Sequence, residues 1–418
     1  MSDLDIDSGL DGGNSDKGCP VGVVNYDHHA VSGMASPFAM IAENRAACPV
    51  AHTAAHDGYW VLFRYDDIVA AAKDSDRFSS SSGVTIPHHS FPIELPPIES
   101  DAPRHREFRS PLTPYFAPKA IKLIEPSIRR SVRNLMSVFI EEGKADLAEQ
   151  LTMRVPAMAI TQLLNIPDED RASFVDWTVR LIRNPEDLDA IGDAMEYFGH
   201  IYDDRQANPQ DDIPTFMLGI EVEGRQISEE EYLCMLNVLV MAGLDTTANA
   251  AANILELLDL QPDVRARLID DPSQIAESID ELLRYVTPLP ALARTTTEDV
   301  EINGIHIPAG DRVLLNWIAA NHDPDVFVDP DTLDLERSRR VSHVAFGAGP
   351  HRCLGTHLAR LELVVLLEEI LRLIGDYKVD RDRVTRFPGL TRGIASLPVT
   401  FTPRSKTTLA DTEGPIHD

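Results

Sequence analysis

The sequence is poor in cysteine and aromatic residues, and acidic residues far outnumber basic ones. Four cysteines occur among 418 residues, at positions 19, 48, 234 and 353, with neither a disulfide framework nor a zinc-ligand spacing. This count favours reduced thiols in a cytosolic protein. With 38 basic and 67 acidic residues, the formal net charge is −29. Such a charge opposes binding to nucleic acid or to an anionic membrane surface.

Targeting and spanning segments are also missing from the sequence pattern. The N-terminus lacks the basic and apolar regions of a signal peptide, and no run approaches the roughly 18–20 apolar residues of a membrane span. We therefore expect a cytoplasmic protein without a membrane anchor. No repeat, linker or charge block divides the chain, which predicts a flexible segment over 1–33, one domain over 34–403 and a flexible tail over 404–418.

The hydrophobic pattern predicts a mainly α fold with a small β portion. A very long helical pattern runs over 229–260, with few breakers apart from Gly243. Other helices are expected over 66–73, 119–142, 273–286 and 354–373. Strands are expected over 59–64, 300–307, 312–315 and 395–402, so both ends of the chain contribute to the β portion. The Ser-, Pro- and His-rich stretch over 78–97 is predicted to be a functional loop.

The segment 346–355 reads Phe-Gly-Ala-Gly-Pro-His-Arg-Cys-Leu-Gly and opens directly into an expected helix. Gly347 and Gly349 permit backbone geometry and close approaches that other residues cannot adopt. Cys353 lies at or just before the helix N-terminus, where free N–H groups and the helix dipole favour a thiolate. A lone cysteine is most often a small buried hydrophobe, but here the whole pattern FGxGxHxCxG is present.

This segment resembles the haem-binding loop of the cytochrome P-450 superfamily, and the Leu-Ala-Arg at 358–360 fits its bacterial members. The resemblance extends over most of the chain, from about residue 58 to 403. It implies the P-450 fold, with the long helix lying over haem b. The haem-contacting residues that it implies in this loop are Phe346, Gly347, His351, Cys353 and Gly355, with Cys353 as the iron ligand. The Cys-Pro pairs at 19–20 and 48–49 lack the glycine loop and are not expected to bind haem.

Within the long helix, residues 241–247 read Met-Ala-Gly-Leu-Asp-Thr-Thr. A glycine inside a helix costs about 1 kcal/mol relative to alanine, which suggests that a bulky ligand approaches Ala242 and Gly243 closely. An acid beside a hydroxyl suits a proton relay. From these residues alone, a small-residue helix crossing with a solvated aspartate is an equal alternative. The resemblance implies that Asp245 and Thr246 are catalytic and deliver protons to dioxygen, with Asp245 connected to solvent.

Glu281 and Arg284 are spaced to share one helix face. By itself such a pair is usually a surface contact. The resemblance implies instead a structural lock behind the cysteine loop. Many relatives carry its third member, an arginine, at the position of Thr332, so we expect Arg337 to replace it.

Haem brings two carboxylates, which need cations or hydrogen-bond donors when buried. The resemblance assigns this role to four residues, His105, Arg109, Arg294 and His351. The alternative for each is an exposed charge. Substrate contacts are expected from Ile93, Val238, Met241, Ala242, Pro290, Leu292 and Ile394. Because these residues are mostly apolar, they favour a small-to-medium hydrophobic substrate held by shape, although each is about as easily a core residue.

The expected reaction inserts one oxygen atom of dioxygen into a C–H bond. No reductase domain is apparent, so the resemblance implies a separate electron donor, a [2Fe–2S]-type or other small ferredoxin with its reductase. Arg106, Arg109 and Arg352 are expected to form a docking patch for that acidic partner. Two alternatives remain. One is a peroxide-driven peroxygenase or decarboxylase on the same fold, whose members lack the acid–alcohol pair. The other is a non-catalytic haem carrier or sensor, which needs no proton relay.

Overall fold

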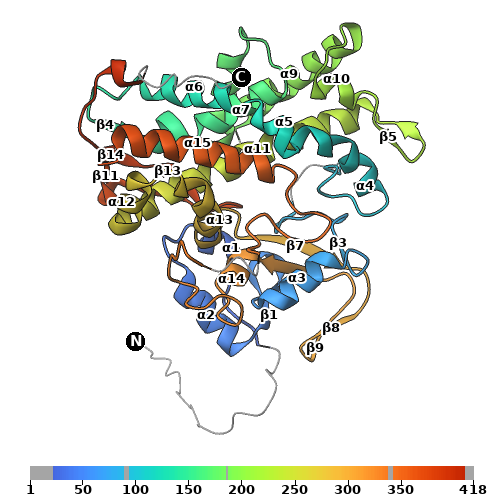
Figure 1. Cartoon of the computed structure of the whole chain (residues 1–418). Coiled ribbons are helices and arrows are strands. Elements are labelled where there is room, and N and C mark those ends of the chain that lie inside the picture. The colour runs from blue at the N-terminus through green and yellow to red at the C-terminus, as the bar shows by residue number, and fades with distance from the viewer. Residues whose placement is uncertain (1–21, 89–93, 185–186, 338–341, 410–418) are drawn as a thin grey trace, which may run out of the picture.

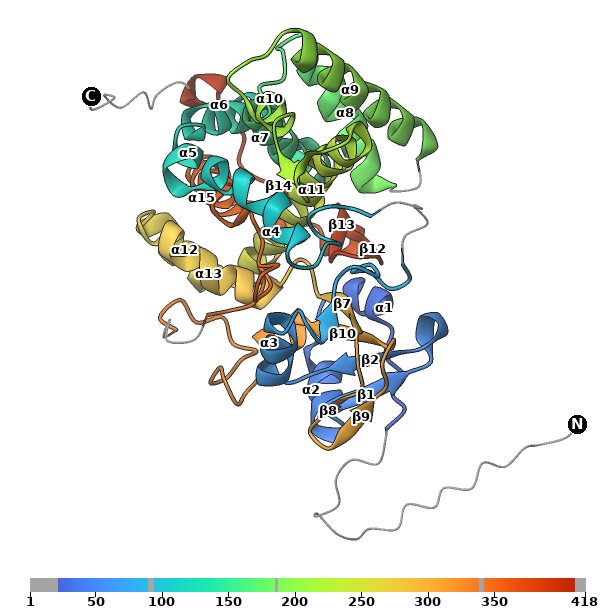
Figure 2. The ribbon, with the colours of Figure 1, turned by 90° about the vertical axis from the view of Figure 1, so that its right-hand side faces the viewer.

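The structure, a computed structural model, describes residues 22–88, 94–184, 187–337 and 342–409. A larger helical part lies above a smaller mixed part, in which N-terminal elements are joined by elements from the last third of the chain (Figure 1). The view turned by 90° shows the same division (Figure 2). The fold is mainly α with a small β portion, as the hydrophobic pattern predicts.

The helical part is built around one long central helix, α11 (Glu229–Leu260). Its start is fixed by a capping box, because the Ser228 side chain accepts from the Glu231 N–H and Glu231 accepts from the Ser228 N–H. The other helices of this part are α4 (Arg104–Arg109), α5 (Pro118–Lys122), α6 (Glu125–Met136), α7 (Arg154–Leu163), α8 (Arg171–Arg183), α9 (Leu188–Ala207), α10 (Ile213–Met217), α12 (Pro262–Asp270), α13 (Gln274–Val286) and α15 (Thr356–Ile374).

The smaller part contains a five-stranded sheet of order β1-β2-β10-β7-β3. Its strands are β1 (Val50–Thr53), β2 (Tyr59–Leu62), β3 (Phe78–Ser79), β7 (Ala291–Thr296) and β10 (Arg312–Asn316). β10 pairs in parallel with β2 and antiparallel with β7, so the two ends of the chain share one sheet. The helices α1 (His28–Ser32), α2 (Phe38–Ala47), α3 (Tyr65–Lys73) and α14 (Trp317–Asn321) surround it.

The remaining strands form small sheets. β4 (Lys144–Asp146), β14 (Pro398–Thr400) and β11 (Lys378–Val379) form a three-stranded sheet in which β14 is central. Three two-stranded pairs are β5 (Glu221–Val222) with β6 (Arg225–Gln226), β8 (Val300–Ile302) with β9 (Ile305–Ile307), and β12 (Thr385–Phe387) with β13 (Gly393–Ser396).

Several expected elements differ from those observed. The helix expected over 119–142 is divided into α5 and α6, and Pro126 lies in the first turn of the second helix, a position that proline favours. The strand expected over 300–307 is a hairpin, because Asn303 and Gly304 turn the chain with φ of 52° and 76°. α3 begins at Tyr65, one residue before the expected start, and no side chain caps it.

The expected boundary at residue 34 lies too far along the chain. Residues 28–32 form α1, and Tyr26 is only 1% exposed. At the other end, residues 406–409 form a short 3₁₀ turn, and Leu409 is buried. The expectation that all cysteines are reduced also fails, because Cys48 is disulfide-bonded, whereas Cys234 and Cys353 are free.

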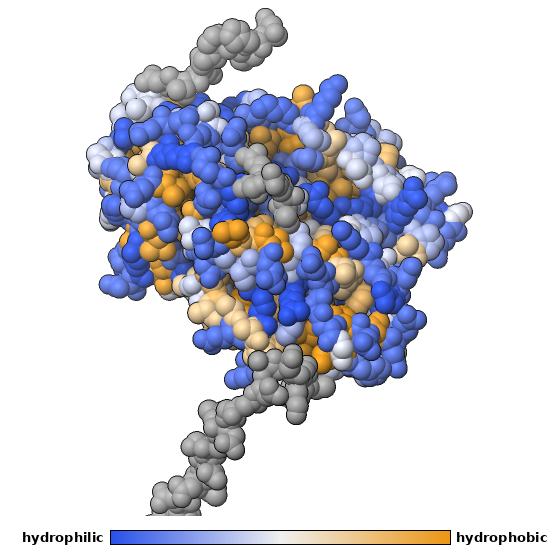
Figure 3. Space-filling view, turned by 60° about the horizontal axis from the view of Figure 1, so that its bottom comes forward, coloured by the Kyte–Doolittle hydropathy of each residue, from blue (hydrophilic) through white to orange (hydrophobic). Residues whose placement is uncertain are grey.

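α11 is long and apolar enough to cross a membrane by length and composition alone, which corrects the expectation that no such segment exists. Half of its most apolar window is buried inside the protein, as expected of a core helix. The face of the molecule shown in Figure 3 is largely hydrophilic, and its hydrophobic residues lie in small separate groups. Packing of α11 against the surrounding helices therefore accounts for its apolar composition.

Candidate active site

A cavity of about 230 Å³ lies between α11, β7 and the segment that joins residue 345 to α15. Much of the wall is apolar and comes from segments far apart in the sequence. The apolar lining residues include Pro97, Ile98, Phe116, Ile160, Val238, Leu239, Leu289 and Leu292.

The cysteine loop forms one end of this cavity. Its closure is fixed by the Cys353 N–H, which donates to the Phe346 carbonyl oxygen at 2.8 Å. Gly347 and Gly349 have φ of 70° and 69°. A Cβ on Gly349 would lie only 2.1 Å from the carbonyl oxygen of Ala72 in α3. Only glycine allows both this backbone conformation and this approach, so the loop is shaped against the smaller part of the fold.

Cys353 lines the cavity just ahead of α15. Burial raises the pKa of its thiol above the ordinary value, while the Gly355 N–H and the Arg109 guanidinium act in the opposite direction. The Gly355 N–H at the helix start thus favours the thiolate, as expected, but burial outweighs it. A metal cation bound to the sulfur would ionise it.

Four nitrogen-bearing side chains gather in the same cavity, and all four were expected from the sequence: His105, Arg109, Arg294 and His351. The rings of His105 and His351 are 4.1 Å apart between centroids. Burial and neighbouring cations lower the pKa of His105 to about 4 and that of His351 to about 3, and burial lowers the pKa of Arg294 to about 10. At neutral pH the positive charge of this cation cluster therefore lies on Arg109 and Arg294, and the two histidines are neutral.

This cluster lacks an anionic partner among the described residues. His105 Nε2 is buried without a hydrogen-bond partner. Asp101 is the nearby acid, but its carboxylate already accepts from the Ser79 hydroxyl and from the Ser80 N–H, the latter at 2.9 Å. Unsatisfied buried donors and cations of this kind fit a ligand that carries carboxylates.

The α11 wall presents Ala242, Gly243 and Thr246 to the cavity. The Thr246 hydroxyl donates back to the Ala242 carbonyl at 2.8 Å. Gly243 has a second neighbour besides the cavity, because an added Cβ would lie 3.0 Å from Ile160 Cδ1 of α7. Its lack of a side chain therefore serves helix packing as well as ligand approach.

Asp245 lies behind Thr246 and does not line the cavity. The Thr391 hydroxyl donates to Asp245 Oδ2 at 2.6 Å, and the Asn249 amide donates to Oδ1 at 2.7 Å. Burial raises the pKa of Asp245 to about 6, although these two hydrogen bonds lower it. The acid is thus held by neutral donors and changes protonation near neutral pH.

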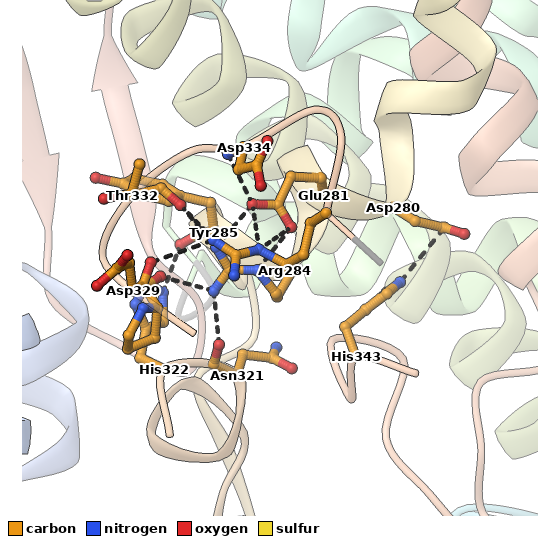
Figure 4. A network of polar contacts seen from close by, with 12 residues as sticks. Asp280, Glu281, Arg284, Tyr285, Asn321, His322, Asp329, Thr332, Asp334 and His343 are labelled. Atoms are coloured by element: carbon orange, nitrogen blue, oxygen red, sulfur yellow. Dashed lines mark hydrogen bonds and ion pairs between the residues drawn. The ribbon is translucent and has the colours of Figure 1, made fainter. Parts of the chain in front are cut away.

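Behind the cysteine loop, Glu281 and Arg284 form a bidentate pair with both N–O distances at 2.8 Å (Figure 4). Arg337 Nε lies 3.0 and 3.1 Å from the two Glu281 oxygens, so it is the third member, as predicted. Arg284 also donates to the Asn321 carbonyl at 2.7 Å. The Asn321 side chain accepts from the Val344 N–H at 2.7 Å, which connects this network to the start of the cysteine loop.

Comparisons with known proteins decide the family. The model of the cytochrome P-450 family matches residues 161–380, just over half of the chain. Cytochrome P-450 130 of Mycobacterium tuberculosis is 33% identical over 341 residues, which cover 78% of this chain and 84% of that protein. The chain belongs to the cytochrome P-450 family.

Other P-450s support the same assignment. Erythromycin C-12 hydroxylase of Saccharopolyspora erythraea is 34% identical over 358 residues, which cover 82% of this chain and 89% of that enzyme. Among solved structures, a mutant of the P-450 EryK in complex with erythromycin B matches with a TM-score of 0.80 at 32% identity, covering 88% of this chain and 97% of that chain. This chain is a P-450 monooxygenase with haem b as its cofactor and dioxygen as its co-substrate.

The cavity fits that cofactor. The cation cluster lacks the anions that two haem propionates carry, and Cys353 offers a sulfur ligand at the same end. Gly355 keeps the space beside the sulfur open, since an added Cβ would lie 3.8 Å from Cys353 Sγ.

Not every residue expected at the site lies there. Among the expected substrate contacts, Val238, Ala242 and Leu292 line the cavity. Three others do not: Met241 packs against the core, Pro290 is buried beside the sheet, and Ile394 is in the core with its N–H bonded to Asn249. Ile93 lies outside the described residues. Of the expected docking arginines, Arg106 and Arg352 are exposed, whereas Arg109 reaches into the cavity.

Glu362 is a residue of this P-450 cavity that the sequence analysis missed. It lies on α15 and is 2% exposed, and its Oε2 has no hydrogen-bond partner among the described residues. Burial raises its pKa well above the ordinary value, which favours the neutral acid. The available signal was an acid among the apolar positions of the helix over 354–373.

Replacing Glu281 with glutamine should destabilise this P-450 by about 3–5 kcal/mol, because Arg284 and Arg337 then keep buried charges without an anion. Urea unfolding followed by circular dichroism and by haem absorbance measures the change. Glu336→Gln is the matched control, since Glu336 pairs with Arg267 on the surface and should change stability by less than about 1 kcal/mol. Equal midpoints for the two variants would contradict the structural role of Glu281.

Proposed function

We propose that this P-450 takes electrons from a separate small ferredoxin, of the [2Fe–2S] or another type, through a ferredoxin reductase. It inserts one oxygen atom of dioxygen into a C–H bond of a small-to-medium hydrophobic substrate. The observation that carries the proposal is the buried acid Asp245, which is the neighbour in α11 of the cavity-lining Thr246. An enzyme that reduces dioxygen must deliver protons to a water-poor site, and an acid with a pKa of about 6 is suited to that task.

Haem b, when bound, supplies the one-electron and dioxygen chemistry of the reaction. Cys353 is its iron ligand in this proposal, and His105, Arg109, Arg294 and His351 hold its propionates. Thr246 presents its hydroxyl to the cavity, while Asp245 stores the proton that Thr246 passes on. Thr391 and Asn249 hold the Asp245 carboxyl in place through their hydrogen bonds.

The apolar wall supports a hydrophobic substrate. Val238, Leu239, Leu289 and Leu292 surround the space near Thr246 with side chains that cannot donate or accept hydrogen bonds. Such a wall excludes water and selects a substrate by shape. Relatives named for their activity include vitamin D(3) 25-hydroxylase and steroid C26-monooxygenase, whose names concern hydrophobic molecules.

Charge supports the proposed partner and location. Arg106 and Arg352 are exposed on a protein whose formal net charge is −29, so they form a local positive surface that an acidic ferredoxin can recognise. The same net charge disfavours binding to nucleic acid and to anionic membranes, in keeping with a cytoplasmic enzyme.

A peroxide-driven peroxygenase is the second candidate. Its members grip a substrate carboxylate with an arginine. Among the described residues that line the cavity, the only arginines are Arg109 and Arg294, which belong to the cation cluster. The acid–alcohol pair also favours the dioxygen-dependent reaction. A haem carrier or sensor needs neither feature.

Turnover with two oxidant systems tests the proposal. With a substrate chosen by spin-state titration against a panel of terpenoids, fatty acids, aromatics and steroids, we expect a ferredoxin, its reductase and dioxygen to form product at least about 10²-fold faster than hydrogen peroxide alone, since only that route uses the proton relay. Product yield measured by mass spectrometry gives both rates.

Arg352→Ala and Arg106→Ala sharpen this test. Both should lower ferredoxin-driven turnover and its dependence on salt, and leave peroxide-driven turnover unchanged. Faster turnover with peroxide than with the ferredoxin system would favour the peroxygenase. Haem binding without product in either system would favour a carrier.

A further inference from the structure

A second cluster of metal-ligating side chains lies in the smaller part of the fold, away from the P-450 cavity. Asp27, His28 and His56 each offer one ligand atom, and these atoms all lie within 4.8 Å of one another. Asp27 caps α1, His28 is the first residue of that helix, and His56 belongs to the short turn between β1 and β2. Two segments separated by 29 positions therefore bring a carboxylate and two imidazoles together.

Hydrogen bonds hold the His28 ring beside this cluster. His28 Nδ1 lies 3.0 Å from the Tyr59 hydroxyl, which also lies 3.0 Å from the Tyr26 carbonyl oxygen. The Ile86 carbonyl accepts a further hydrogen bond from His28. A histidine whose ring is held by a hydrogen bond at one nitrogen has the arrangement typical of metal-ligating imidazoles.

The remaining ligands are also positioned. His56 Nε2 lies 3.1 Å from Asp27 Oδ1. His56 has φ of 48° and ψ of 50°, a left-handed conformation that is uncommon outside glycine and turns its side chain toward α1. His29 stands beside both rings, with centroids 4.4 Å from His28 and 5.0 Å from His56.

We propose that Asp27, His28 and His56 bind one divalent transition-metal ion, with Zn²⁺ as the best match. Two imidazoles and a carboxylate are ligands that zinc accepts in tetrahedral sites. Tetrahedral bonds of about 2.0–2.1 Å place ligand atoms about 3.4 Å apart, so small side-chain rotations close the cluster.

Water or His29 would be the fourth ligand of the tetrahedral zinc ion. The Ile86 carbonyl hydrogen-bonds to His28 and His29 in the metal-free arrangement, and metal binding replaces that contact.

A metal bound by these residues would link the start of α1 to the turn between β1 and β2. α1 also reaches the loop that carries Thr391, because the Gly389 N–H donates to the Ser32 hydroxyl at 2.9 Å. A ligand that binds only the folded state stabilises it according to its concentration and affinity. At saturating zinc we expect the Tm of the holoenzyme to rise by about 2–4 °C.

The test uses the full-length haem-loaded enzyme with any affinity tag removed, first dialysed against a chelator. Titration calorimetry with zinc chloride, and metal analysis after gel filtration, should give one tightly bound zinc per chain and the rise in Tm. Asp27→Asn removes the charged ligand but retains a residue that caps helices equally well. His56→Ala removes a partly exposed ligand. Each should weaken zinc binding at least tenfold and remove the Tm rise.

His200→Ala is the matched control, because His200 is exposed on α9 outside this cluster. It should bind zinc like the parent, and haem content should be the same in all variants. No bound zinc in the parent, or equal zinc binding by the parent and by both ligand variants, would overturn the proposal.

Discussion

Cys353→Ser should abolish product formation and the thiolate-type absorption of the reduced carbonyl complex. Among the described residues that line the cavity, Cys353 offers the one sulfur, and the serine hydroxyl is far harder to ionise and donates less electron density to iron. Haem content can persist, because the cation cluster and the apolar wall still hold the porphyrin. Absorption spectra of the reduced enzyme with and without carbon monoxide, and product yield, measure the two effects.

Cys234→Ala is the control for this substitution. Cys234 is a free buried cysteine on α11 that does not line the cavity, so the spectrum and turnover of this variant should match those of the parent. A normal thiolate-type spectrum in Cys353→Ser would show that another residue ligates the iron.

Asp245→Asn should lower product formation by about 10²–10⁴-fold, the range typical of a positioned proton donor. The asparagine side chain can keep both hydrogen bonds, since the Thr391 hydroxyl can reverse its direction. Because the pKa of Asp245 is about 6, the parent rate should fall as pH rises through about 6, and this limb should be absent in the variant. Steady-state rates between about pH 5 and about pH 9 give the profile.

The same substitution should stabilise the protein at high pH. The folded-state pKa of Asp245 is raised from 3.8 to about 6, so the neutral acid is favoured. Its contribution to stability is therefore complete below about pH 3.8 and is lost as pH rises through about 6. The Asp245→Asn variant carries no ionisable group at this position and avoids the loss. We expect it to gain about 1–3 kcal/mol at about pH 8 and little at about pH 4.

Thr391→Val distinguishes the relay from a general effect of the site. Loss of its hydrogen bond raises the pKa of Asp245, so the limb in the rate profile should move to higher pH. A parent profile without a limb near pH 6, or a profile in Thr391→Val identical to that of the parent, would contradict the role of Asp245.

The parts of the fold and site that could be predicted from the sequence are those marked by characteristic local residue patterns. The bounds expected for the central helix, 229–260, coincide with α11, because a capping box marks its start and an unbroken apolar pattern follows. The cysteine loop was recognisable because glycines with positive φ must recur at fixed positions. Arg337 was also found, although the usual position of the third arginine is Thr332 here.

The sequence alone did not show which face of α11 lines the cavity, and this limited the prediction of the substrate contacts. Val238, Ala242 and Thr246 are four residues apart, so they share the cavity face of α11. Met241 and Asp245 fall on the adjacent face, which explains why Met241 misses the cavity and why Asp245 bonds to Thr391. The Thr391 contact joins residues 146 positions apart, and a single sequence contains no signal for such a pairing.

Strand pairing across the chain affects how the enzyme is made in the cell. β2 hydrogen-bonds to β10, and β4 to β14, so two of the sheets need partners from the last part of the chain. A ribosome that has released only the first 300 residues has not yet produced β10, β14 or the iron ligand. Domains fold as units once their partners are present. The complete pocket with its cysteine is therefore available to the porphyrin only at the close of translation or after it.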